Sequence, residues 1–199
     1  MQSDKSTRLE TINDSKNILD MKITIQNVVA SATLNQSFNL NDIQSNFHNT
    51  EYRPKRFPGL VFRLKRPKTA TLIFSTGKMV CTGAKSEKLA ISAINKVVKQ
   101  LKTGGIIVLN KPIITIQNMV ASANLQNRVD LETAADILDN VMYEPEQFPG
   151  LIYRMNDPKT VLLLFSSGKI VCTGGKSSKM VNESVHKLFK VLSDYELFY

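Results

Sequence analysis

One long stretch of this chain occurs twice, and that repetition limits the possible folds more than any other feature. KRFPGLVFRLKRPKTATLIFSTGKMVCTGAK begins at Lys55, and EQFPGLIYRMNDPKTVLLLFSSGKIVCTGGK begins at Glu146. The offset of 91 residues needs no gap, and it also pairs ITIQN at 23–27 with ITIQN at 114–118. Solenoid repeats are about 20–50 residues long, so each copy here is expected to be a small domain or half of one domain.

The repeat divides the chain into three parts. Repeat 1 is predicted at residues 21–111 and repeat 2 at 112–199, related by gene duplication with pseudo-two-fold symmetry. Residues 1–20 are polar, mixed in charge and without periodicity, which predicts a disordered tail. The longest apolar runs are too short to span a membrane and no signal-peptide core is visible, so we expect an intracellular globular protein.

Within each repeat the pattern predicts a strand, a short helix, three strands and a longer helix, which is an α+β fold with an antiparallel sheet. Asn39 and Asp130 are suited to cap the short helices. Ser86 and Ser177 are suited to cap the longer ones. Each longer helix has one apolar stripe: Leu89, Ile94, Val97, Val98 and Leu101 in repeat 1, and Met180, Val185, Leu188, Phe189 and Leu192 in repeat 2.

The strands are apolar on both faces. Met79 and Cys81 alternate with Val80 and Thr82, and the second copy shows the same alternation. Helices with one stripe cover only one face of a sheet, so the other face should present apolar side chains to a ligand. The alternative is that the two repeats pack sheet against sheet. The two cysteines of the chain are repeat mates without a local partner, which predicts buried thiols and neither a disulfide nor a metal site.

Charge is distributed unevenly over the chain, whose net charge is +9. Repeat 1 carries 15 basic against 3 acidic residues, whereas repeat 2 carries 8 against 10. A basic half of this size favours a polyanion such as nucleic acid, and the competing interpretation is a solvated lysine-rich surface.

The expected open face suits the minor groove of DNA. Its predicted floor is uncharged and contains Asn27, Val29 and Thr82, with the mates Asn118, Val120 and Thr173. A·T pairs show only hydrogen-bond acceptors in that groove, whereas a G·C pair adds an amino group that apolar side chains would leave unpaired. Cations at the rim would hold phosphates: Arg63, Lys78 and Lys85, with the mates Arg154, Lys169 and Lys176.

The motifs QNVVASA, FPGLVFRL, PKTATLIF, the doubled VCTG and YEPEQFPGLIYRM closely resemble the TATA-box-binding protein family. The resemblance covers both repeats, and EPEQFPGL is similar to the archaeal branch. It implies a saddle, in which a curved antiparallel sheet carries its helices on the convex face. It also implies a general transcription factor that kinks TATA-box DNA from the minor groove with apolar wedges and nucleates initiation-complex assembly.

The resemblance also implies roles for individual residues. The wedges would be Phe57, Phe74, Phe148 and Phe165. Asn27 and Asn118 would lie near the centre of the site, flanked by Val29, Leu72, Val80, Thr82, Val120, Leu163, Val171 and Thr173. The loop with Glu144, Glu146 and Gln147 would recruit transcription factor B and, indirectly, the RNA polymerase machinery. The location would be chromosomal DNA in an archaeal cytoplasm, or the nucleus in a eukaryote.

Other functions are less well supported. The GGKS run lacks the first glycine of a P-loop, since position 170 is isoleucine. The two histidines do not correspond by repeat and lie in no catalytic or metal-binding motif, so neither an enzyme nor a cofactor is expected. The main alternative is a saddle of similar fold whose sheet binds a protein segment.

Overall fold

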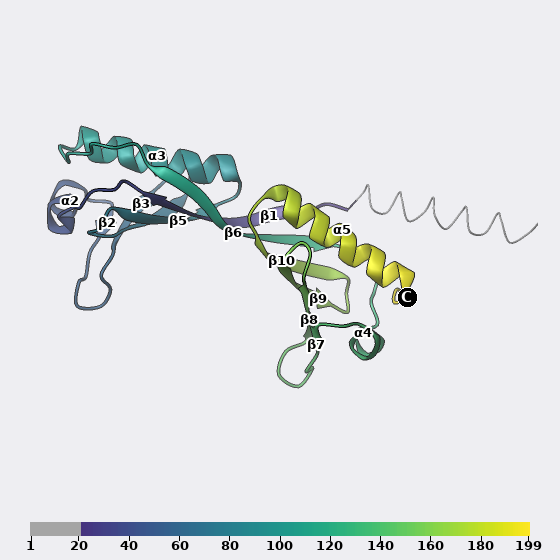
Figure 1. Ribbon diagram of the computed structural model, residues 1–199. Coiled ribbons are helices and arrows are strands. Elements are labelled where there is room, and N and C mark those ends of the chain that lie inside the picture. The colour runs from purple at the N-terminus through teal and green to yellow at the C-terminus, as the bar shows by residue number, and fades with distance from the viewer. Residues whose placement is uncertain (1–20) are drawn as a thin grey trace, which may run out of the picture. The chain divides into compact units, whose positions relative to one another are not determined.

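The computed structural model describes residues 21–199 (Figure 1). This part of the chain forms two compact units, one spanning Ile25–Met119 and the other Val120–Tyr199 together with the chain up to Thr24. We call them the N-terminal and C-terminal units and describe each by itself. The tail predicted at residues 1–20 lies outside the described residues.

The elements follow the predicted order in each repeat. Those of the first copy are β1 (Thr24–Thr33), α2 (Leu40–Asn46), β2 (Thr50–Glu51), β3 (Leu60–Leu64), β4 (Thr69–Ile73), β5 (Lys78–Ala84) and α3 (Glu87–Thr103). Those of the second are β6 (Ile113–Asn124), α4 (Leu131–Ile137), β7 (Val141–Met142), β8 (Gly150–Met155), β9 (Thr160–Phe165), β10 (Lys169–Gly175) and α5 (Ser178–Asp194).

The strands are hydrogen-bonded in the order β2-β3-β4-β5-β1-β6 on one side and β6-β10-β9-β8-β7 on the other, so that β6 contributes to both units. Pairing within each unit is antiparallel. The predicted α+β class with an antiparallel sheet is therefore confirmed. The two-residue strands β2 and β7 were not anticipated, because a strand of that length has no periodicity in the sequence.

Side-chain caps begin all four helices of residues 21–199 at the predicted positions. The Ser86 and Ser177 hydroxyls accept hydrogen bonds from the N–H groups of Leu89 and Met180 at 3.1 and 3.2 Å. Asn39 and Asp130 cap α2 and α4 in the same way, at 3.1 and 3.0 Å. These bonds satisfy backbone donors that have no partner within the helix.

The long helices bury one face against the strands of their own unit. In α3 the buried residues are Ala90, Ala93, Ile94, Val97, Val98 and Leu101. The prediction for Leu89 is wrong, since this side chain is 42% exposed. Ala90 takes the buried position in the first turn, and Leu89 lies about 100° around the helix from it. In α5 the predicted stripe is buried, except that Met180 is half-buried.

The turn before β5 and the turn before β10 require glycine. Gly77 and Gly168 have φ angles of +80° and +77°, a region that residues with a side chain rarely adopt. A Cβ at either position would also collide with a backbone carbonyl oxygen, that of Gln36 or of Asn127. The STGK and SSGK turn signals therefore encode the same backbone twice.

The two cysteines are buried and free, as predicted. Burial raises the pKa of the Cys81 thiol, and it raises that of Cys172 to about 11. Both side chains consequently stay neutral at physiological pH and act as small apolar groups in the core.

The chain after each long helix folds back onto its own unit. The Asp130 and Tyr199 N–H groups donate to the carbonyls of Leu197 and Arg128, at 3.0 and 3.1 Å. In the N-terminal unit a side chain does this instead, because the Gln36 amide binds Ile107 O and Leu109 N at 2.9 and 2.8 Å. Among residues 21–199, no helix is long and apolar enough to cross a membrane.

Candidate functional site

Each unit has a sheet face that its helices do not cover, which we call its open face. In β4 and β5 the residues Thr69, Thr71, Ile73, Met79 and Cys81 are buried, whereas those between them are half-exposed. Register makes rows across the open face. One row is Val61–Leu72–Val80–Ser31 and the next is Arg63–Ala70–Thr82. The C-terminal unit repeats them as Ile152–Leu163–Val171 and Arg154–Val161–Thr173.

A pair of phenylalanines lies at the end of each open face. The ring centroids of Phe57 and Phe74 are 5.8 Å apart with an interplanar angle of 65°, and those of Phe148 and Phe165 have the same separation and angle. Phe57 is 41% exposed, and the other three rings are half-buried. Edge-to-face packing of this kind holds each ring in a defined position.

The glycine of each FPGL sequence makes room for the ring pair. A Cβ on Gly59 would lie 2.7 Å from Cε1 of Phe57 and 3.0 Å from Cε1 of Phe74. For Gly150 the corresponding distances to Phe148 and Phe165 are 2.8 and 3.0 Å. The repeated FPGL sequence therefore places two aromatic rings over a residue that has no side chain.

The polar group at the other end of the open face is held by its neighbours. The Asn27 Oδ1 accepts a hydrogen bond from the Gly83 N–H at 2.7 Å, and its Nδ2 lies 3.1 Å from the Thr82 hydroxyl. Because a backbone donor occupies the amide oxygen, the Asn27 side chain presents N–H to a ligand. The mates Asn118 and Thr173 also have interaction partners.

A hollow lies beside each ring pair. In the N-terminal unit it measures about 680 Å³ and is lined by Pro58, Phe74, Lys78 and Val80, among others. In the C-terminal unit it measures about 700 Å³, and its lining residues lie at the repeat-equivalent positions. One difference stands out: Lys22 lines the C-terminal hollow where Ile113 lines the N-terminal one. Two separate hollows of equal form indicate one ligand feature that is met twice.

The predicted cations are exposed, but they divide into two groups. Arg63, Arg154, Lys78 and Lys169 share the strand parity of the open-face residues. Lys85 and Lys176 lie beyond the alternating part of the strand, in the turn into α3 or α5. Strand geometry therefore brings only the first group onto the open faces.

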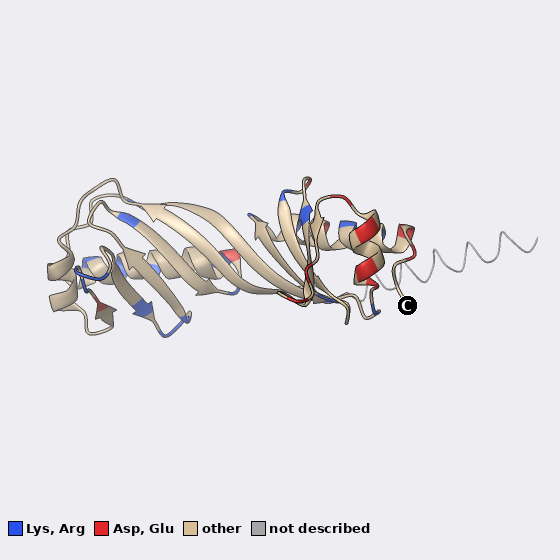
Figure 2. Cartoon of the chain, turned by 90° about the horizontal axis from the view of Figure 1, so that it is seen from below, with Lys and Arg blue, Asp and Glu red and all other residues tan. Residues whose placement is uncertain are grey.

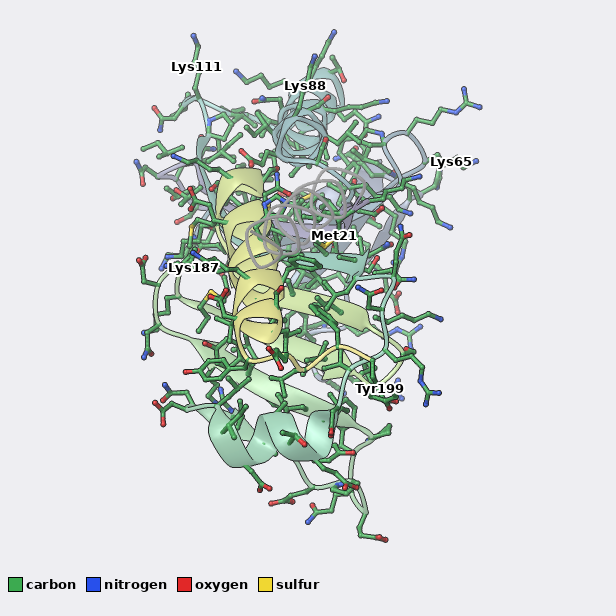
Figure 3. The ribbon with its side chains drawn as sticks, turned by 90° about the vertical axis from the view of Figure 1, so that its right-hand side faces the viewer. Met21, Lys65, Lys88, Lys111, Lys187 and Tyr199 are labelled. Carbon is green, nitrogen blue, oxygen red and sulfur yellow. The ribbon has the colours of Figure 1, made fainter. Side chains whose placement is uncertain are left out.

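The charge difference between the repeats is visible on the surface. Figure 2 shows the loop before β3 in blue and the loop before β8 in red, and most of the acidic residues belong to the C-terminal unit. In Figure 3 the Lys111 side chain projects away from the ribbon. Glu144, Glu146 and Gln147 are all exposed.

The sequence did not indicate every part of the open face. Val61, Ala70, Ile152 and Val161 complete its rows and were not predicted, although their strand parity was a usable signal. The bond from the Gly83 N–H to Asn27 had no such signal, because it joins residues 56 apart.

Two repeats of one α+β unit, each with an apolar open face, a ring pair and bordering cations, define a duplicated sheet protein whose ligand meets both copies. The family model "Transcription factor TFIID (or TATA-binding protein, TBP)" matches residues 22–103 and 113–195. The chain belongs to this family of general transcription factors, and it is not an enzyme.

Relatives with high identity are archaeal. The chain is 52% identical to the TATA-box-binding protein of Sulfurisphaera tokodaii over 174 residues, 87% of this chain and 88% of the relative. It is 54% identical to that of Pyrodictium occultum over 168 residues, 84% of each chain. The solved structure of Methanococcus jannaschii TBP matches with a TM-score of 0.80 and 46% identity, over 87% of this chain and 99% of that one. The predicted family and its archaeal character are confirmed.

Proposed function

We propose that this protein binds A·T-rich promoter DNA through the minor groove, kinks it with four phenylalanine wedges and recruits transcription factor B, and through it the RNA polymerase machinery. It does so inside the cell, on chromosomal DNA. The observation that carries the proposal is the pair of open faces, each with a ring pair at one end and an asparagine near the other. They repeat at a constant offset of 91 residues.

Chemical complementarity supports the choice of A·T base pairs. The open-face rows of the N-terminal unit are mainly aliphatic, and their polar members at Asn27 and Thr82 can donate hydrogen bonds. Acceptors are what an A·T pair presents in the minor groove. A G·C pair would bring an amino donor onto an apolar surface, and an unsatisfied donor costs about 1–3 kcal/mol.

The ring pairs suit the role of wedges. Each ring is held by its stacked partner and by the close approach to Gly59 or Gly150, so little side-chain freedom is lost on insertion. Unstacking a base step costs roughly a few kcal/mol, which the apolar contact with the ring offsets. Arg63, Lys78 and Lys85, with their mates, are proposed to hold the adjacent phosphates.

The wedge proposal is tested by Phe148→Ala combined with Phe165→Ala. Both rings lie on an open face, so the thermal midpoint should stay close to that of the wild type while bending of an A·T-rich duplex, measured by fluorescence transfer between its ends, is lost. The control is Phe189→Ala, which removes a buried ring of the same unit. That change should cost about 3–5 kcal/mol of stability and leave bending by the folded protein intact. The reverse pattern would contradict the proposal.

The competing function, binding of a protein segment on the same faces, is separated by a titration. Short A·T-rich duplexes should bind, G·C-rich ones of equal length should bind far less, and affinity should fall steeply with salt. Arg63→Ala should reduce the salt slope by about one unit, since one phosphate contact is lost. Binding that ignores both base composition and salt would favour the protein ligand.

Recruitment of transcription factor B is assigned to the exposed loop with Glu144, Glu146 and Gln147. Glu144→Lys with Glu146→Lys should abolish the ternary complex in a mobility-shift assay and leave DNA binding nearly unchanged. The matched control is Asp136→Lys with Asp139→Lys, the same charge change elsewhere on the C-terminal unit. Normal recruitment by the loop variant would show that another surface binds the factor.

A further inference from the structure

The loops that lead into the two ring pairs have one backbone and opposite charges. In repeat 1 the N–H groups of Arg56 and Phe57 donate to the Arg53 carbonyl at 2.9 and 3.0 Å. In repeat 2 the N–H groups of Gln147 and Phe148 donate to the Glu144 carbonyl, both at 2.9 Å. The turn therefore forms whatever the side chains are, and the charges are free to serve a ligand.

The basic loop retains unneutralised charge. It reads Arg-Pro-Lys-Arg at 53–56, whereas the equivalent loop reads Glu-Pro-Glu-Gln at 144–147. Arg53 forms an ion pair with Glu51, with Nε and Oε1 2.9 Å apart, and both side chains are about half exposed. Lys55 and Arg56 are exposed and have no ion pair or side-chain hydrogen bond within residues 21–199.

The loop cannot move far from the ring pair. Arg56 directly precedes Phe57, whose ring is fixed against Phe74 and Gly59. One residue spans at most about 3.5 Å, so the cationic groups of Lys55 and Arg56 stay within a few residue lengths of the wedge. A wedge at the end of a bent site leaves the duplex continuing past it. The nearest polyanion to this loop is then the phosphate backbone of the flanking duplex.

We propose that Arg53, Lys55 and Arg56 bind backbone phosphates of the duplex that continues beyond the A·T-rich site on the side of Phe57, and that this contact orients the protein on symmetric sites. The inference rests on the proposed DNA-binding function. Glu144 and Glu146 repel phosphates at the equivalent place, within a Debye length of about 10 Å at 0.1 M salt. Base contacts from matched open faces cannot tell the two ends of a palindrome apart, whereas the two loops can.

The test uses a palindromic A·T-rich core with flanking duplex at one end only. An iron chelate attached at Asn41→Cys, an exposed position on α2, cleaves the DNA near repeat 1, while the buried Cys81 and Cys172 stay unlabelled. The variant Arg53→Glu, Lys55→Glu, Arg56→Gln copies the charges of the second loop. Its control makes the same charge change on the exposed side of α3, as Lys88→Glu, Lys99→Glu, Lys102→Gln.

The wild type and the α3 control should cut mainly at the flanked end, and the loop variant should lose or reverse this preference. Its salt slope on the flanked duplex should fall by about two units, with little change on the bare core. Equal cutting at both ends by all three proteins, with binding and bending intact, would overturn the inference alone. Loss of a protein complex without any change on DNA would overturn it in favour of an acidic protein partner. Failure of every protein to bind either duplex would instead contradict the proposed function.

Discussion

The two units keep the same open face and differ beneath it. In the N-terminal unit the buried Phe62 ring packs against Phe47, with centroids 5.3 Å apart. Their repeat mates are Tyr153 and Leu138, both half-buried. The open-face positions opposite, Val61, Leu72 and Val80, keep apolar mates of similar size. Duplication thus preserved the surface that meets a ligand, while the core was free to change.

The core change involves a third position. A Cβ on Gly104 would collide with the Phe47 ring, so the aromatic ring requires glycine there. The mate of Gly104 is Tyr195, which is exposed and follows the smaller Leu138 in the other copy. Side-chain volume has moved from one position to another, as close packing demands. A repeat can therefore diverge in its core only through coupled substitutions.

The largest expected effect separates the two cores. Phe62→Ala should lower the free energy of unfolding by about 3–5 kcal/mol, because it leaves a cavity beneath the sheet. Tyr153→Ala removes a half-buried ring, whose cavity opens to solvent, so its cost should be clearly smaller. Urea denaturation followed by circular dichroism measures both. Equal losses would show that the difference in burial between the two rings has no energetic consequence.

The next effect tests what the repeats share. Gly59→Ala and Gly150→Ala should each push the ring pair apart, at a cost of about 1–3 kcal/mol that includes displaced rings. A Cβ on Gly150 also lies 3.3 Å from the Leu164 carbonyl oxygen, which cannot move aside, so Gly150→Ala should be the more damaging. The measurements are the unfolding free energy and duplex bending. Normal bending by both variants would mean that the glycines do not position the rings.

Sequence periodicity predicted most of the fold, because caps, stripes and strand alternation are local patterns. Ser86, Ser177, Asn39 and Asp130 all cap as expected. Leu89 was misplaced because Leu89 and Ala90 are adjacent apolar residues, and only packing decides which of them faces the sheet. The repeat boundaries at 21–111 and 112–199, and the saddle shape, stay predictions.

The open face was foreseen less completely. Residue pairs at a constant offset pointed to the phenylalanines and asparagines, since few pressures keep an exposed aromatic residue twice. The Asn27–Gly83 bond and the hollow beside Phe74 depend on strand register, which a single sequence does not specify. Lys85 and Lys176 were grouped with the open-face cations because they follow the strand, but glycines with positive φ at 83 and 174 end its alternation before them.

The smallest effect concerns the caps of α2 and α4, which are neutral in one repeat and ionisable in the other. Asn39→Ala should cost about 1 kcal/mol at any pH, because an amide cap does not titrate. Hydrogen bonds from the Thr133 N–H and hydroxyl lower the pKa of the Asp130 carboxyl below its ordinary value.

A lowered folded-state pKa gives stability that is present above the unfolded pKa, about 3.9, and is lost as the pH falls through the folded value. The unfolding free energy of the wild type minus that of Asp130→Asn should therefore decrease on acidification from about pH 5 into that range. Asn39→Asp should introduce the same pH dependence in repeat 1, where the wild type has none at this cap. A difference between wild type and Asp130→Asn that is constant over this range would show that the charge of Asp130 does not contribute to capping α4, and that the two caps are equivalent despite their chemistry.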